Sequence, residues 1–239
     1  MAENKLKLNA DKTHIMTVGT SARLQMQSSQ VRVVMDGLTL ETLLGLQIEP
    51  ILKWHKQIEE LLKKLKKRLT GLANLRSIIP FHLRKRITEG MFTSVLSYCL
   101  PVFGGCEKYE LEALQVMQNQ AASLVTHLPS RTPRTEIYSM VGWLTVNQLV
   151  FYHSALSTFR IRQSGEPRYL NNIMSRDNRA SNIIVPNTTL TLAKKSYSYR
   201  AAEQWNSIPF NIRNIQKIGQ FKSHLKKWIH TNIAKFDDT

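Results

Sequence analysis

The chain has 239 residues, a formal net charge of +16 and 42% hydrophobic residues. A chain of this length can bury a sizeable core, and its hydrophobic content excludes wholesale disorder. The excess of positive charge favours a polyanionic partner, because contacts to phosphates release counterions. Nucleic acid is therefore favoured over the alternative of a basic protein that has no such partner.

The apolar runs and the two cysteines indicate the cellular compartment in which the protein is expected. No apolar run reaches the roughly eighteen residues of a membrane-spanning helix, so we expect no membrane partner. The polar residues at the start of the chain do not resemble a signal peptide. Cys99 and Cys106 form neither a disulfide framework nor a zinc-binding pattern. A reducing, intracellular compartment is expected, with nucleus and cytoplasm both left open.

Residues 14–48 are expected to be rich in β-structure. Short apolar runs predict three strands, at residues 15–18, 31–34 and 43–48. Short strands with little helix between them predict a small antiparallel sheet or hairpin.

From residue 53 the apolar residues recur every three or four positions, which indicates amphipathic helices. The first long helix is expected to bury a stripe formed by Trp54, Ile58, Leu61, Leu65, Leu69 and Leu72. Its opposite face carries Lys53, Lys56, Lys63 and Lys67. We expect Pro80 to end this element. A second helix over residues 82–98 should turn inward Ile87, Met91, Val95 and Leu96.

Leu100-Pro101 should break the second helix, and a third is expected over residues 110–128. Further helices are predicted over residues 136–141, 146–161, 199–205 and 218–233. The polar stretch 165–195 is expected to be a loop with one small hairpin, near 183–185 and 190–192. The fold class is therefore mainly α with a small N-terminal antiparallel β element. The expected segments are residues 1–50, 51–106 and 107–239.

The sharpest local motif is residues 8–13, Leu-Asn-Ala-Asp-Lys-Thr. A lysine held in a loop beside a polymerase site can neutralise, or donate a proton to, the leaving pyrophosphate. The same residues also fit an ordinary polar turn with a solvated lysine, so this segment alone leaves both interpretations open.

The motifs that follow this loop come in a specific order. Leu44-Gly45-Leu46 precedes Trp54 and His55, which begin the long basic helix, and Tyr98 and Pro101 come later. Three further motifs are residues 114–121, Leu-Gln-Val-Met-Gln-Asn-Gln-Ala, residues 199–209, Tyr-Arg-Ala-Ala-Glu-Gln-Trp-Asn-Ser-Ile-Pro, and residues 221–228, Phe-Lys-Ser-His-Leu-Lys-Lys-Trp. Over nearly the whole chain, this series resembles the C-terminal part of reverse transcriptases encoded by jockey-like non-LTR retrotransposons.

The resemblance implies a role for each segment. Residues 1–50 would be the end of the palm, with Lys12 and Asn9 as remnants of its lysine motif. Residues 51–106 would be a thumb-like helical bundle that packs on an RNA/DNA template–primer duplex. Residues 107–239 would be the family's helical C-terminal region, in which residues 205–209 look like a structural signature.

The chain departs from the family at its catalytic carboxylates. Palm aspartates of the intact enzymes bind two Mg²⁺ ions and drive nucleotidyl transfer. The only adjacent aspartates here are Asp237-Asp238, which lack flanking strands. We therefore expect a fragment of an RNA-directed DNA polymerase that holds no cofactor of its own and is inactive alone. An upstream polymerase core would be its partner.

Nucleic-acid binding is the chemistry expected to remain, through Lys56, Lys63, Lys67, Arg84, Lys85 and Arg86. The same charges also fit the solvated face of an amphipathic helix. The alternative function is accordingly a basic helical structural or interaction protein without a nucleic-acid role. No histidine spacing, phosphate-binding glycine loop or nucleophile elbow supports another enzyme.

Overall fold

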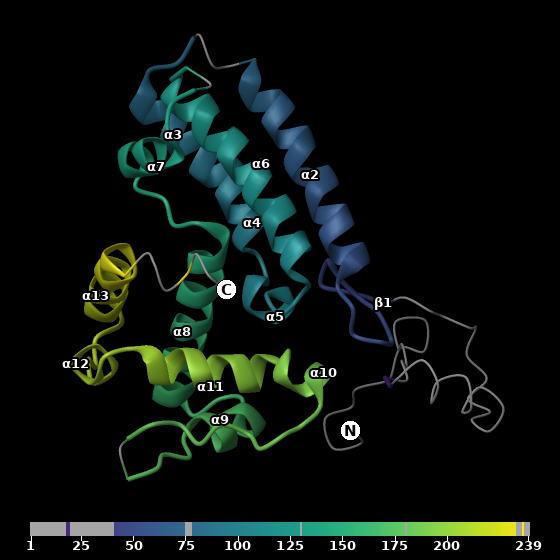
Figure 1. Ribbon diagram of the computed structural model, residues 1–239, viewed down its shortest axis with the longest axis vertical. Coiled ribbons are helices and arrows are strands. Elements are labelled where there is room, and N and C mark those ends of the chain that lie inside the picture. The colour runs from purple at the N-terminus through teal and green to yellow at the C-terminus, as the bar shows by residue number, and fades with distance from the viewer. Residues whose placement is uncertain are drawn as a thin grey trace, which may run out of the picture. The chain divides into compact units, whose positions relative to one another are not determined.

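Helices dominate the computed structural model of this protein (Figure 1). The structure describes residues 18–19, 41–74, 78–129, 131–179, 181–232 and 236. The chain forms two compact units, residues 1–60 and 61–239. The expected mainly α fold with a small N-terminal antiparallel β element is confirmed. The division of the chain at residues 50/51 and 106/107 stays a prediction.

The first unit contains an antiparallel hairpin of β1 (Glu41–Leu43) and β2 (Leu46–Ile48), which pairs Glu41 with Ile48. Leu44 and Gly45 form its turn, with φ angles of 51° and 83°. Two positive φ angles give the two-residue turn that matches the twist of paired strands. The prediction of one strand over residues 43–48 is therefore wrong, because this turn divides the run between two strands.

The other two expected strands, at residues 15–18 and 31–34, lie outside the described residues except for Val18, which is not in a strand. The hairpin that is described has one side chain in the core, because Leu46 is buried. The backbone N–H of Gln47 donates to Oε1 of Gln57 at 2.8 Å, which ties β2 to the helix that follows.

The long helix α2 (His55–Ala73) follows the predicted amphipathic pattern. Its buried residues include the five predicted core positions within the helix, Ile58, Leu61, Leu65, Leu69 and Leu72. Trp54, immediately before the helix, is half-buried. The helix ends at Ala73, well before Pro80, which instead precedes α3 (Phe81–Thr88). Proline suits that position because a helix start leaves its N–H groups unpaired.

The predicted second helix is interrupted by a π-helical turn, η3 (Glu89–Thr93), between α3 and α4 (Ser94–Ser97). Single π turns occur inside α-helices, frequently at functional sites. Thr88, Phe92 and Leu96 are buried at intervals of four residues, whereas Met91 is 40% exposed. The prediction that Met91 faces inward is therefore wrong, because the buried side of these helices passes through Phe92.

The expected break at Leu100-Pro101 is present, because Cys99 adopts a left-handed conformation before α5 (Leu100–Phe103). The remaining helices are α6 (Lys108–Thr126), α7 (Arg134–Val141), α8 (Val146–Ser164), α9 (Arg168–Met174), α10 (Thr191–Lys194), α11 (Tyr197–Ser207), α12 (Phe210–Arg213) and α13 (Ile218–Thr231). Five of them, α6, α7, α8, α11 and α13, confirm predicted helices, with shifts of a few residues at the ends.

The stretch 165–195 differs from its prediction as a loop with a hairpin. It contains the short helices α9 and α10, and Ile183 forms an isolated antiparallel bridge with Asp177 instead of pairing with residues 190–192. Helices of seven and four residues span too few turns to show a hydrophobic period in the sequence.

Helix α8 lies at the centre of the second unit. It contacts α5, α6, α9, α11 and α13, and Figure 1 shows these helices around it. Its N-terminus has a capping box in which Thr145 and Gln148 bond each other's backbone N–H groups. Phe159 stacks on Phe221 with ring centroids 4.5 Å apart, which joins α8 to α13. Within the described residues, no helix is both long and apolar enough to cross a membrane.

Candidate nucleic-acid interface

Four lysines gather on the solvent side of α2. Lys63, Lys64, Lys66 and Lys67, here called the α2 lysine cluster, are all exposed and belong to the second unit. Leu61, Leu65 and Leu69 are buried on the opposite side, so core packing holds this part of the helix in place. Lys63 and Lys67 are four residues apart, a spacing at which like charges destabilise a helix by about 0.2–0.5 kcal/mol. A bound polyanion would offset this repulsion.

Lys56 precedes the cluster on α2 and belongs to the first unit. Its side chain is exposed. The predicted lysines Lys56, Lys63 and Lys67 are thus all open to solvent. The sequence pattern did not predict the exposure of Lys64 and Lys66, which lie next to Lys63 and Lys67 in the helix.

The three consecutive basic residues of α3 are placed differently, because successive side chains of a helix point in different directions. Arg84 is half-buried, and its guanidinium donates to the carbonyl of Val125 at 3.0 Å and to that of Ile79 at 2.9 Å. Lys85 is half-buried and lies 3.9 Å from the carboxylate of Glu89. Arg86 is exposed. Of the three, Arg86 is the side chain most available to a phosphate.

The lysine motif of the sequence, with Asn9 and Lys12, lies outside the described residues. Asp237-Asp238 also lies outside them. In the described part of the chain, no three or more His, Cys, Asp or Glu side chains gather in a way that could hold a metal ion. The described residues therefore do not fit the two-magnesium site of the polymerase family.

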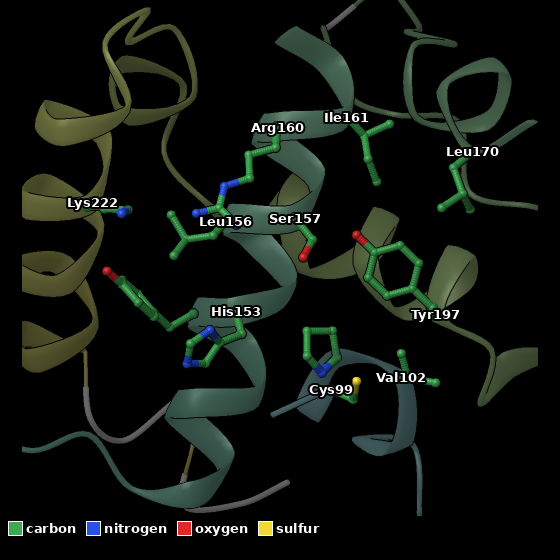
Figure 2. Close-up of a pocket in the computed structure, with 12 residues that line it drawn as sticks. Cys99, Val102, His153, Leu156, Ser157, Arg160, Ile161, Leu170, Tyr197 and Lys222 are labelled. Carbon is green, nitrogen blue, oxygen red and sulfur yellow. The ribbon is translucent and has the colours of Figure 1, made fainter. Parts of the chain in front are cut away.

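A groove runs along α8, and sequence reasoning missed it. It has a volume of about 600 Å³ and is lined by residues of α5, α8, α9, α11 and α13, together with Cys99 (Figure 2). Figure 2 shows His153, Ser157 and Arg160 of α8 between Lys222 on one side and Tyr197 on the other. We call this the α8 groove. No sequence signal pairs Arg160 with Lys222, because only the packing of α13 on α8 brings them to one surface.

Burial sets the protonation of the groove's titratable side chains. The pKa of His153 is lowered by burial and further by the nearby Arg160, so its imidazole is neutral at pH 7. Burial raises the pKa of Tyr197 and of Tyr152, so both remain phenols. The charge of the groove at neutral pH therefore comes from Arg160 and Lys222.

A search of protein-family models, curated proteins and solved structures finds no match. The order of motifs along the chain is therefore the basis for a resemblance to reverse transcriptases. The geometry of the basic surfaces stands independently of that resemblance.

Proposed function

We propose that this chain is the thumb-like and C-terminal region of an RNA-directed DNA polymerase of a non-LTR retrotransposon, and that it binds an RNA/DNA template–primer duplex. Two arguments support the proposal. One is the ordered set of motifs, which extends from residue 8 to residue 228. The other is the net charge of +16, which favours a partner that carries phosphates.

The observation that carries the binding proposal is the α2 lysine cluster. Its four exposed lysines fall within five consecutive residues, which rise only about 6 Å along the helix axis. Such a cluster meets a few neighbouring phosphates and not a long stretch of backbone. Lysine ammonium groups contact phosphates without reading base edges, so the expected binding is independent of sequence. Lys56, in the first unit, and Arg86 are exposed and are separate candidate contacts to phosphates.

Nucleotidyl transfer is not assigned to the described residues, because they contain no carboxylate cluster that fits two magnesium ions. In the intact family enzyme those ions would supply the chemistry. The role proposed for this chain is to hold the duplex.

The test measures fluorescence anisotropy of a labelled RNA/DNA duplex over a series of salt concentrations. The double variant Lys63→Gln/Lys67→Gln should bind more weakly, and the slope of log affinity against log salt should fall by about two, because each lost phosphate contact removes roughly one counterion. Both side chains are exposed, so circular dichroism should show unchanged helix content.

A matched control is Arg131→Gln/Arg179→Gln, which removes two charges from exposed positions outside α2. Both double variants lower the formal net charge from +16 to +14. Equal losses of duplex affinity in the two double variants would refute a role for α2 and indicate a general effect of net charge. No duplex binding by the native chain at low salt would favour the alternative, a basic helical structural or interaction protein.

A further inference from the structure

The α8 groove has the size and setting of a ligand site. Its volume of about 600 Å³ lies within the roughly 300–1,000 Å³ typical of small-molecule pockets. Helices from several parts of the chain build it, and α8 is held among them by packing on α5, α9, α11 and α13. A groove lined by rigid helices is suited to binding because little conformational freedom is lost when it is filled.

The described residues that line the α8 groove give it positive charge and no negative charge. Arg160 and Lys222 are its two cations at neutral pH, and none of the residues that line it is acidic. Among the residues that the structure describes, neither cation forms an ion pair. Figure 2 shows both side chains on the same side of α8. An arginine and a lysine together favour a phosphate, since the guanidinium fork matches two of its oxygens.

The far side of the groove is apolar and aromatic. Val102, Leu170 and Tyr197 line it there, across α8 from Lys222 (Figure 2). An aromatic ring gains from contact with such side chains, and base–aromatic stacking is worth about 1–3 kcal/mol per base. The hydroxyl of Tyr197 lies 3.4 Å from that of Thr158, a contact that helps to hold the ring in place at this side of the groove. The groove thus combines an anion-binding side with a ring-binding side.

We propose that the α8 groove binds a nucleotide unit, with its phosphate at Arg160 and Lys222 and its base against Val102, Leu170 and Tyr197. The unit is either a free nucleotide or one unpaired nucleotide of a strand, because the two share this chemistry. The groove has no residue in common with the α2 lysine cluster. This inference goes beyond duplex binding by α2, and either can fail without the other.

The experiment titrates the full chain, at low salt, with three fluorescein-labelled probes: uridine monophosphate, a ten-nucleotide oligo(dT) strand and an RNA/DNA duplex. Arg160→Gln/Lys222→Gln should weaken binding of the strand about tenfold or more, because hydrogen bonds to charged groups are lost. Its affinity for the duplex should stay within about twofold. The matched control Arg176→Gln/Lys226→Gln removes an exposed arginine and an exposed lysine that do not line the groove, and should leave strand binding unchanged.

A second pair of variants keeps the two cations. Val102 is 42% exposed, so its replacement should not disturb folding. Val102→Glu should weaken strand binding, because it adds a negative charge to the side of the groove where the base would lie, whereas the uncharged Val102→Gln should weaken it less. Binding of uridine monophosphate at the strand's affinity would identify a free nucleotide as the ligand, and binding of the strand alone would identify an unpaired segment.

The proposal is overturned if Arg160→Gln/Lys222→Gln binds both single-stranded probes as the native chain does. It is also overturned if an oligo-glutamate peptide occupies the groove and the nucleotide probes do not, since the partner would then be an acidic protein segment. Loss of duplex binding in Lys63→Gln/Lys67→Gln, with strand binding intact, leaves the groove proposal standing. The failure of one proposal is thereby separated from the failure of the other.

Discussion

Arg84 illustrates how a cation can act as a structural hydrogen-bond donor. Its guanidinium joins the start of α3 to the C-terminal part of α6 through the carbonyls of Ile79 and Val125. Carbonyls in the last turn of a helix have no intrahelical partner, and a cation there also interacts favourably with the helix dipole. The neighbouring Arg86 is exposed. Arg84 and Arg86, two residues apart, thus have different environments.

Replacing Arg84 by methionine should lower the free energy of unfolding by about 1.5–3 kcal/mol, because hydrogen bonds from a charged donor are lost. Arg86→Met should change it by about 0.5 kcal/mol or less, as expected of an exposed side chain. Urea denaturation followed by circular dichroism compares the two. Similar stability of both variants would contradict the structural role of Arg84.

At the scale of elements, the side chains that enter the core along α3, η3 and α4 differ from the predicted set. The buried residues are Thr88, Phe92 and Leu96, which follow one another at intervals of four. Of the predicted inward residues, Leu96 is buried, Ile87 and Val95 are half-buried and Met91 is exposed. The core side of these helices therefore runs through Phe92 and not through Met91.

Phe92→Ala should therefore destabilise the protein by about 3–5 kcal/mol, because it opens a cavity in a closed core. Met91→Ala, at a side chain that is 40% exposed, should cost about 1 kcal/mol or less. Thermal and urea unfolding of both variants would measure the difference. A greater loss for Met91→Ala would mean that Met91, and not Phe92, is packed in the core in solution.

At the scale of the whole molecule, α5 and the loop that follows it are joined to the start of α11, almost a hundred residues later. Arg200 donates to the carbonyls of Pro101 at 2.8 Å and Lys195 at 3.0 Å. Lys195 forms an ion pair with Glu107 at 2.5 Å. Burial lowers the pKa of Arg200, and a Cβ on Gly105 would lie 2.8 Å from its Nε. Glycine is required there because the guanidinium and backbone approach so closely.

Gly105→Ala should consequently lower the free energy of unfolding by about 1–3 kcal/mol, since the added methyl group would also come within 2.3 Å of the Lys195 carbonyl. Gly71→Ala is the matched control, because a Cβ there meets nothing within 4 Å. It lies on an exposed part of α2 and should stabilise the protein by about 0.5–1 kcal/mol. Chemical denaturation measures both; a neutral Gly105→Ala would show that the loop relaxes freely.

The sequence alone was sufficient to predict a helix where apolar residues recur on one face over many turns. The core stripe of α2 follows the predicted pattern, and α13 begins at the predicted residue 218 and buries Phe221, Leu225 and Ile229. The sequence was insufficient to predict the hairpin turn at Leu44-Gly45, because leucine is not a residue that usually adopts a positive φ in such turns. It also missed α9 and α10, whose length is too short for a period to be recognised.

The sequence by itself determined the helical class, the charge of the molecule and the exposure of Lys56, Lys63 and Lys67, because these depend on composition and on the local period of one helix. Only the tertiary structure decided that Arg84 binds backbone carbonyls, that Phe92 replaces Met91 in the core, and that Arg160 and Lys222 line one groove. Each of these depends on contacts between segments that are distant in the chain. Such contacts are not encoded in the spacing of neighbouring residues.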